Sequence, residues 1–332
     1  MEEKKRRGIL YYYELAALIA LEIMLAFSAW GYIRLDYISI TFVSLVVLAA
    51  AYLLGPWEGS AAGIIFGLTG MWKATIVTTE VTYVDLMFSP VRSGAPTQSV
   101  LLCLVPRILL GFVAGLLYAK AKKAGRYRAL WVTLATIGAQ MIHILLVFGL
   151  MQWLFPEAGV KWWSPVSSWH TNGMEIEMIC SVIAVVLLHY MCESTWVKDK
   201  IDKVREGVLA SKYTKVIYWQ WIALIVIGIL GFSVCMDFRN GIDDIVQIYD
   251  VMPGETSRDV LQALLVQFVV AQFALFVLIG IMQSFIYYYY ASAEVRSRMD
   301  MMTGAFNRAT LIQTIEHDLR NLKEKQKVLF IM

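Results

Sequence analysis

The chain has 332 residues, of which 59% are hydrophobic and 17% charged, and its formal net charge is +3. A soluble domain needs far less apolar surface, so this composition predicts a protein whose main solvent is the lipid bilayer. The small net charge argues against nucleic acid as a partner. Four cysteines occur singly, without CxxC spacing, so the sequence predicts neither disulfides nor a metal site.

Apolar stretches long enough to cross a bilayer recur along the chain. Basic residues concentrate before the first stretch, between the fourth and fifth, and between the sixth and seventh, whereas an acidic segment follows the seventh. The positive-inside rule therefore predicts a multi-pass protein with both termini in the cytoplasm. No cleavable signal is evident at the N terminus. The eight predicted spans lie near residues 9–33, 36–54, 57–75, 98–119, 129–155, 173–193, 216–236 and 260–290.

The third and fourth spans are rich in glycine. Gly63 and Gly67 in the third span, and Gly111 and Gly115 in the fourth, recur at near-helical spacing. Glycine at this spacing lets two helix backbones approach closely inside a membrane bundle. The fourth span also carries Arg107, and a charge at this depth usually faces a partner, a cavity or a ligand.

Two stretches of these spans resemble the S component, the substrate-binding subunit of energy-coupling-factor vitamin transporters. They are Leu54-Gly-Pro-Trp-Glu-Gly-Ser-Ala-Ala-Gly63 and Val105-Pro-Arg-Ile-Leu-Leu-Gly-Phe-Val-Ala-Gly-Leu-Leu-Tyr118. The resemblance covers about residues 10–193 and implies a six-helix bundle that holds its ligand from outside, under the 76–97 and 155–172 connections. In that family, small residues on the first helix contact the transporter partner, and Ala16 and Ala20 have suitable spacing here.

Several polar residues in the predicted bundle are candidates for ligand binding. Glu22 and Arg107 lie near the middle of spans one and four, where they either contact a ligand, pair with each other, or belong to a polar cluster on the cytoplasmic side. His143 shares a face of span five with Gln140. For these two, an interhelical hydrogen bond is favoured over a ligand contact.

The predicted outer loop before span six supplies a second group of candidates. Glu175 and Glu177, beside His170, either bind a cationic or amine group or are solvated carboxylates at a helix end. The tryptophans of this loop either belong to an interfacial aromatic belt or form a lid that stacks on a flat ring. They are Trp162, Trp163 and Trp169.

Polar and turn-forming residues gather after the last span, at Asp300, Thr303, Gly304, Asn307 and Arg308. They resemble the Asp-x-Leu-Thr-Gly-Leu-x-Asn-Arg opening of the GGDEF (diguanylate cyclase) family, with Met302 and Ala305 in place of the leucines. An amphipathic stripe after this motif predicts a helix, and residues 327–332 read as a buried strand. The family's metal-binding aspartate and its signature hairpin would come after Met332, so we expect no catalytic or metal site here. Mg²⁺ and GTP are expected only with a complete cyclase domain.

The sequence therefore predicts an all-α polytopic membrane protein of about eight transmembrane helices, followed by the truncated α/β start of a GGDEF domain. The predicted units are a six-helix domain at 1–193, a cytoplasmic linker at 194–215, a two-helix hairpin with an acidic outer loop at 216–290, a signalling helix at 291–299 and the GGDEF start at 300–332. A heptad-like pattern in the last span suggests a homodimer. It consists of Leu278, Met282, Phe285, Tyr289 and Ser292.

The leading hypothesis is a receptor of the bacterial cytoplasmic membrane. It binds a small organic ligand, such as a vitamin, from outside and signals to a diguanylate cyclase, which makes cyclic di-GMP. The alternative is a substrate-binding subunit of an energy-coupling-factor type transporter. A membrane enzyme acting inside the bundle has only Glu22, Arg107 and His143 to support it, because no hydrolase constellation or phosphate-binding loop appears.

Overall fold

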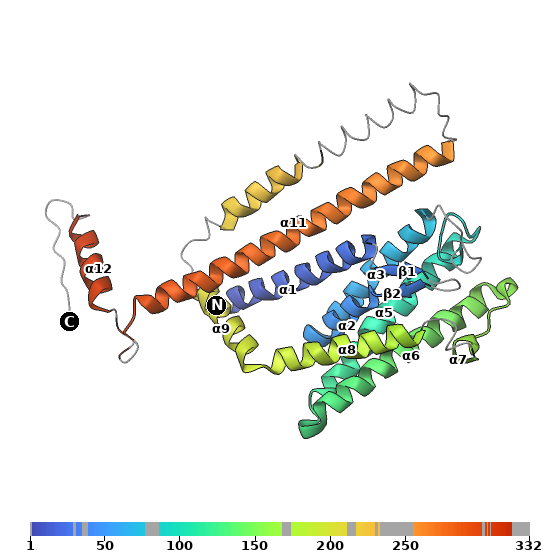
Figure 1. The fold of residues 1–332 in the computed structure, drawn as a ribbon, viewed down its shortest axis with the longest axis horizontal. Coiled ribbons are helices and arrows are strands. Elements are labelled where there is room, and N and C mark those ends of the chain that lie inside the picture. The colour runs from blue at the N-terminus through green and yellow to red at the C-terminus, as the bar shows by residue number, and fades with distance from the viewer. Residues whose placement is uncertain are drawn as a thin grey trace.

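The computed structural model describes residues 2–28, 31–34, 39–76, 86–167, 174–210, 217–229, 232, 255–300, 303, 305 and 307–320. Figure 1 shows a bundle of helices with one long helix, α11, along its side. The main helices are α1 (Glu2–Phe27), α2 (Ser44–Leu53), α3 (Pro56–Ile76), α5 (Pro96–Ala121), α6 (Arg128–Leu154), α8 (Met174–Glu193), α9 (Thr195–Ala210), α11 (Glu255–Ser297) and α12 (Arg308–Arg320). The short elements are β1 (Tyr32–Arg34), β2 (Ser39–Thr41), α7 (Ser164–Ser167) and two 3₁₀ turns, η1 (Gly125–Tyr127) and η2 (Pro156–Ala158).

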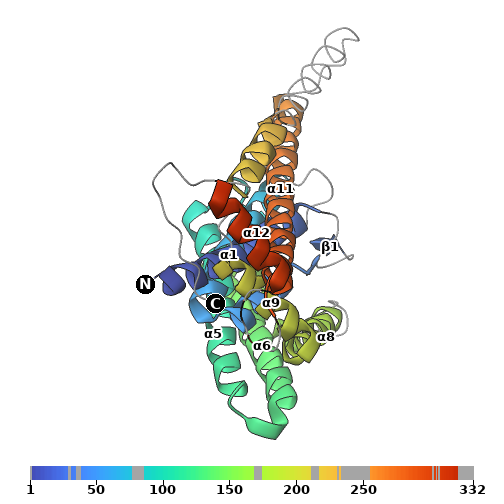
Figure 2. The same ribbon diagram turned by 90° about the vertical axis from the view of Figure 1, so that its left-hand side faces the viewer.

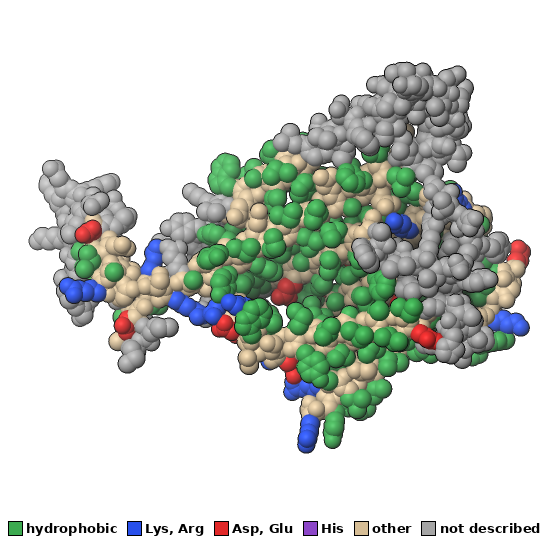
Figure 3. Space-filling view, viewed as in Figure 1, with side chains coloured by type: hydrophobic (Ala, Val, Ile, Leu, Met, Phe, Trp, Pro, Cys, Tyr) green, Lys and Arg blue, Asp and Glu red, His purple; other side chains and the backbone are tan. Residues whose placement is uncertain are grey.

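Five helices in the described residues are long and apolar enough to cross a membrane. Hydrophobic side chains cover the middle of the described surface in Figure 3, and Lys and Arg side chains lie mostly around its margins, among them the end that carries α9. This distribution is typical of a protein whose middle section lies in the lipid bilayer. The chain is therefore a helical membrane protein, as its composition predicted. The five segments are Leu10–Phe27, Pro96–Ala121, Gly125–Leu154, Met174–Glu193 and Gln262–Ala293.

Three predicted spans are not among these five segments, and one of them, at 57–75, is the continuous 21-residue helix α3. The predicted span at 36–54 is wrong as one continuous helix, because β2 pairs antiparallel with β1 and the helix α2 begins only at Ser44. With 10 residues, α2 is about 15 Å long, half the thickness of a bilayer core. The β-branched residues around Ile40 favour the hairpin. Of the predicted span at 216–236, the structure describes a helix over Ile217–Ile229.

Glycine and proline separate α2 from α3. Gly55 has φ +126°, a conformation that side-chain-bearing residues rarely adopt, and Pro56 follows at the first position of α3. The chain therefore reverses within two residues, so α2 and α3 pack side by side. The stretch Leu54–Gly63, which resembles the S component, includes the sharp connection between α2 and α3 and the first turns of α3.

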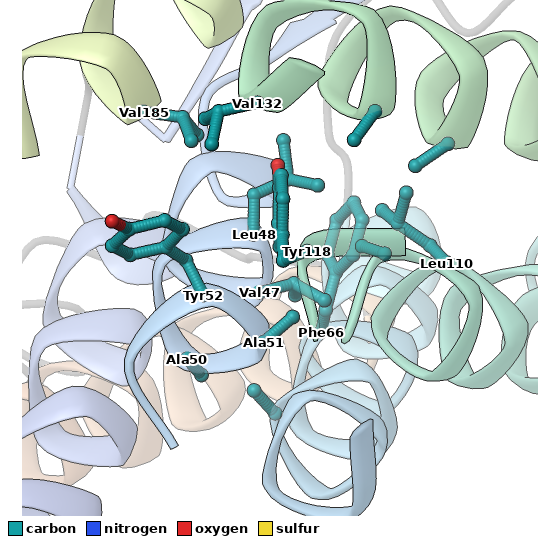
Figure 4. Packing of buried hydrophobic residues seen from close by; sticks show 14 of the residues in the cluster. Val47, Leu48, Ala50, Ala51, Tyr52, Phe66, Leu110, Tyr118, Val132 and Val185 are labelled. Carbon is teal, nitrogen blue, oxygen red and sulfur yellow. The ribbon is translucent and has the colours of Figure 1, made fainter. Parts of the chain in front are cut away.

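The core of the bundle forms around α2. Val47, Leu48 and Tyr52 from α2 meet Phe66 from α3 and Tyr118 from α5, and all five side chains are buried. Figure 4 shows that residues of α6 and α8 close the same cluster from the other side. The short central helix thus has packing partners around most of its circumference.

Backbone contact between α3 and α5 confirms the prediction made from glycine spacing. A Cβ atom built at Gly63 would collide with the carbonyl group of Arg107, and one built at Gly111 would collide with the carbonyl group of Gly59. A Cβ at Gly115 would meet the backbone of Pro56. Only glycine permits this approach. We call this contact the glycine seam (Gly59, Gly63, Gly67, Gly111 and Gly115).

The long helix α11 lies beside α1 in both Figure 1 and Figure 2, and α9 crosses it near the N-terminal end of α1. It contains 43 residues without interruption. A bilayer crossing needs only about 20 residues, so α11 extends well beyond one. It therefore joins the apolar body of the protein directly to the turn before α12.

Candidate functional site

Arg107 is the central polar residue of the bundle. It lies near the middle of α5 and is 8% exposed. Its guanidinium carbon is 4.6 Å from the centre of the Phe66 ring and 5.4 Å from that of Phe88, and its Nη1 donates a 2.7 Å hydrogen bond to the Cys103 carbonyl. Its Nε–H has no hydrogen-bond partner, and no ion pair joins it to any acid of the described residues. The two rings offset part of the buried charge, but an edge of the guanidinium is left for an anion.

His143 and Gln140 on α6 make the interhelical hydrogen bonds that the sequence favoured. The His143 Nδ1 lies 3.1 Å from the carbonyl oxygen of Pro106, and Gln140 Nε2 donates to Ser181 Oγ at 2.9 Å. A carbonyl only accepts, so Nδ1 carries the proton of a neutral ring and Nε2 remains an acceptor. His143 also lies beside the Phe66 ring, with the ring centres 6.5 Å apart. It therefore belongs to the surroundings of Arg107.

Glu177 enters the same region from the first turn of α8. Its Oε1 accepts hydrogen bonds from Thr41 Oγ1 at 3.2 Å and from Ser44 Oγ at 3.1 Å. These contacts tie α8 to the β-hairpin and to the start of α2. Among the described residues, Glu177 and Arg107 form no ion pair. Glu175, two residues earlier, points from a different side of α8.

Glu22 on α1 is the deepest acidic residue of the described chain. It is 0% exposed, and neither carboxylate oxygen has a hydrogen-bond partner. It lies beside the backbone of Phe66, whose ring carries Arg107 on its face. The ion pair between Glu22 and Arg107, one of the alternatives that the sequence left open, is not formed, and each residue instead lies beside Phe66.

Replacing Glu22 by methionine should stabilise the protein. A buried carboxyl group without a partner costs about 1–3 kcal/mol, and Met has a similar volume. We expect Glu22→Met to raise the free energy of unfolding by about that amount, measured by thermal unfolding in one detergent. The matched control is Glu177→Met, which leaves two hydroxyl groups without their acceptor and should lower stability. An equal loss of stability in both variants would contradict the interpretation that Glu22 is a buried carboxyl group without a partner.

The tryptophan loop is separate from the Arg107 region in the described part of the chain. Trp162 and Trp163 are 50% and 45% exposed, and their rings meet edge to face at 5.7 Å. Lys161 Nζ lies 5.2 Å from the centre of the Trp163 ring. No described interaction joins either tryptophan to Arg107, His143 or Glu177. The interfacial aromatic belt and the lid over a ligand ring therefore both stay predictions. Trp169 and His170 lie outside the described residues.

Aromatic contacts fasten α11 to α1 and to the helix Ile217–Ile229. Tyr13 on α1 stacks on Trp221 at 6.5 Å and meets Phe285 of α11 edge to face at 6.2 Å. At the other end of α1, Gln267 of α11 donates to the carbonyl oxygen of Phe27 at 3.4 Å. We call this contact the α1–α11 seam. It runs almost the full apolar length of α1.

The heptad-like residues of α11 largely face their own chain. Phe285 packs on Tyr13, and Tyr289 accepts a 2.9 Å hydrogen bond from Lys200 of α9. Ser292 is buried, whereas Met282 is 56% exposed. Phe285 and Tyr289 are therefore occupied within their own chain. The homodimer stays a prediction, and it would have to use another face of α11. A groove of about 520 Å³ beside this helix is lined by Gln220, Leu224, Gln283, Ile286, Tyr287 and Tyr290.

The turn before α12 is built by the residues that carry the GGDEF resemblance. One oxygen of Asp300 accepts hydrogen bonds from both the backbone N–H and the hydroxyl group of Thr303, each at 2.9 Å. Asn307 caps α12 by accepting from the Thr310 N–H at 2.9 Å, and its amide donates to the Ser297 carbonyl at 2.6 Å. Arg308 is exposed, and Gly304 lies outside the described residues. The predicted helix is present as α12, whereas the strand at 327–332 is outside the described residues.

Substitution of Asn307 should loosen α12 without affecting the bundle. Asn307→Ala removes the helix cap, worth about 1 kcal/mol, and the bond to the end of α11. We expect faster amide hydrogen exchange over residues 308–314, with unchanged exchange in α5 and α6. Arg308→Ala is the control, because its exposed side chain makes no cap. Unchanged exchange in Asn307→Ala would show that the cap does not hold this helix.

A polar network near the C-terminal ends of α2, α5 and α8 was not predicted from the sequence. The Tyr52 hydroxyl and His189 Nδ1 are 2.8 Å apart, and the Tyr118 hydroxyl and Thr136 Oγ1 are 2.9 Å apart. Lys122 donates to the carbonyl oxygen of Tyr52 and lies over its ring. Four helices contribute one partner or more each, and no spacing within a single helix reveals such a network. These groups satisfy one another and have a structural role.

The comparisons with known proteins give no family for this chain. A scan against models of protein families found no match, and a search of curated proteins found none either. In the described residues, no group of His, Cys, Asp or Glu is arranged to hold a metal ion. The function therefore has to be argued from the site and the helices that leave it.

Proposed function

We propose that the chain is a receptor of the bacterial cytoplasmic membrane that binds a small organic molecule from outside and passes the signal through α11 to a diguanylate cyclase module. The observation that carries the proposal is the uninterrupted helix α11. It packs on the ligand-binding bundle through α1 and ends at the Asp300 turn, where the GGDEF resemblance begins.

The binding half of the proposal rests on the residues around Arg107. A buried guanidinium with an unused N–H and no acid partner among the described residues is costly unless something else compensates it. His143 offers a neighbouring acceptor, and Glu177 offers a carboxylate nearer the hairpin end of the bundle. With the positive-inside orientation, that end faces outside.

The signalling half rests on the position of α1. Glu22 on one side of this helix lies beside Phe66, and Tyr13 lies against α11 and Trp221. A ligand that moves Arg107 acts on Phe66, and a shift of Phe66 changes the surroundings of Glu22. The state of the bundle thus reaches α11 through one intervening helix. A ligand shifts this equilibrium only by its differential affinity for the two states.

Burial of Ala20 favours sensing over transport. Of the two residues with suitable spacing to contact an energising partner, Ala20 is 4% exposed within the chain itself and Ala16 is half-buried. Because α11 packs along one side of α1, a transporter partner would have only the exposed side of that helix, with Tyr12 and Leu21, to contact. Co-purification with an ATPase module, together with energy-dependent uptake, would instead support the transport alternative.

A crosslinking experiment tests the coupling. Cysteines introduced at the exposed positions Ile286 and Tyr290 of α11, in a chain without its native cysteines, report movement between copies in nanodiscs. The probes are the water-soluble vitamins and the standard amino acids. We expect at least one to change the crosslinking yield, and an Arg107→Met variant to lose that response. A probe that binds, at saturation, without any change in yield would defeat the coupling.

A further inference from the structure

Glu22 is an acid for which the described fold provides no partner. Its side chain is 0% exposed, and neither carboxylate oxygen accepts a hydrogen bond within the described residues. It lies in the apolar segment Leu10–Phe27, beside the backbone of Phe66. A negative charge without a partner in an apolar interior is so costly that the group becomes neutral instead. The structure therefore requires a positive species that neutralises Glu22.

Three of the helices packed on α1 carry no charge near Glu22. They are α2, α9 and α11. The helix α2 contains no charged residue, and α11 contains none between Asp259 and Glu294, a stretch that covers the whole α1–α11 seam. The helix α9 is charged, but it lies near the N-terminal end of α1. On α1 itself, the nearest charged residue is Glu14, about two helical turns earlier.

The helices α3 and α5 also leave Glu22 without a counter-charge. On α3, the charged residues nearest to Phe66 are Glu58 and Lys73, each about two helical turns away from it. Arg107 of α5 lies on the Phe66 ring, but no ion pair between Arg107 and Glu22 is formed in the described structure. Side chains of the packed helices therefore do not neutralise Glu22.

We propose that Glu22 is a proton-binding site, which is protonated while α1 is packed on α3 and releases its proton to water when the two helices separate. A proton needs no space beyond the oxygen that carries it, so it suits a side chain with no exposed surface. A metal cation such as Mg²⁺ needs about six oxygen ligands, and in the described residues no group of acids is arranged to supply them. A larger cation would need an opening beside the carboxyl group.

Proton binding makes the contact between α1 and α3 sensitive to pH. A glutamic acid in water ionises at about pH 4, so near neutral pH a separated α1 loses the proton that a packed α1 keeps. Rising pH therefore favours separation, by up to about tenfold in the equilibrium constant for each pH unit. Because α1 also packs along α11, a proton-dependent position of α1 acts directly on the long helix. This sensitivity goes beyond the proposed receptor function, because it needs no ligand at Arg107.

Infrared spectroscopy of the full chain in nanodiscs tests the protonation directly. A neutral carboxylic acid has a carbonyl stretching band that is separate from the bands of a carboxylate. At about pH 7, where a solvated acid is ionised, we expect a neutral-acid band that is lost in Glu22→Gln and shifted in Glu22→Asp. The control Glu193→Gln should keep the band, because Glu193 is exposed and ion-paired with Arg128. Identical neutral-acid bands in the parent chain and in Glu22→Gln would show that Glu22 is ionised and would overturn the proposal.

Thermal unfolding without ligand gives a second measurement. Because the folded chain holds a proton that the unfolded chain releases, the midpoint of the parent should fall between about pH 6 and pH 8 by more than that of Glu22→Gln in the same detergent. Glu193→Gln should keep the pH dependence of the parent. Parallel pH dependence in the parent and Glu22→Gln would mean that folding binds no proton at Glu22, and the proposal would be wrong. Neither measurement uses a ligand, so failure here leaves the receptor function untouched.

Discussion

The substitution Gly111→Ala is expected to destabilise the bundle more than any other single-methyl change we can name. The new Cβ would overlap the carbonyl group of Gly59, which is backbone and cannot rotate away. Relief requires α3 and α5 to separate, and that motion loosens every contact of the glycine seam. Overpacking a well-packed interior costs about 1–3 kcal/mol and sometimes more, and contact with backbone places this change at the upper end.

The matched control is Gly149→Ala on α6. A Cβ at Gly149 meets nothing within 4 Å, and alanine is the better helix former by about 1 kcal/mol. Thermal unfolding in the same detergent should therefore show a lower midpoint for Gly111→Ala and an equal or higher midpoint for Gly149→Ala. Equal midpoints for Gly111→Ala and the parent chain would mean that the two helices are not in backbone contact.

A proline at position 282 of α11 should disconnect the bundle from the Asp300 turn. Met282 is exposed, so little packing is lost, but proline removes a helical hydrogen bond and clashes with the carbonyl group of Leu278. The local cost is about 3 kcal/mol, and the helix bends or breaks there. We expect faster amide exchange over residues 279–290 and no ligand-dependent change in crosslinking at Tyr290.

The Met282→Ala variant controls for loss of the side chain and should keep both the slow exchange and the crosslinking response. Binding itself should survive the proline, because the Arg107 region lies on other helices. A proline variant that binds its ligand and still shows the full crosslinking response would rule out α11 as the route of the signal.

The sequence was most informative where a property depends on one helix at a time. Long apolar runs predicted the five segments that are long enough to cross a membrane, and the spacing of Gly63 and Gly111 predicted close backbone packing. The hairpin of β1 and β2 was missed because β2 directly precedes the apolar helix α2, and the predicted span was extended back across it. Hydropathy counts such residues but does not register their backbone conformation.

Relations between distant helices were beyond the reach of these patterns. Glu22 and Arg107 were both noted as deep charges, but only the fold shows that they form no pair and that each lies beside Phe66. The heptad-like pattern at Phe285 and Tyr289 was read as a dimer contact, although α1 and α9 already cover these residues. An apolar stripe indicates that something packs on it but does not identify the partner.

If α11 carries the signal, its length would amplify a small tilt. A helix of 43 residues is about 65 Å long, so a tilt of about 5° around its outer end would carry its other end through about 6 Å. The glycine seam between α3 and α5 has no side chains that can change rotamer, and α1 lies between that part of the bundle and α11. A displacement too small to notice at Arg107 would then arrive at Asp300 as more than the pitch of one helical turn.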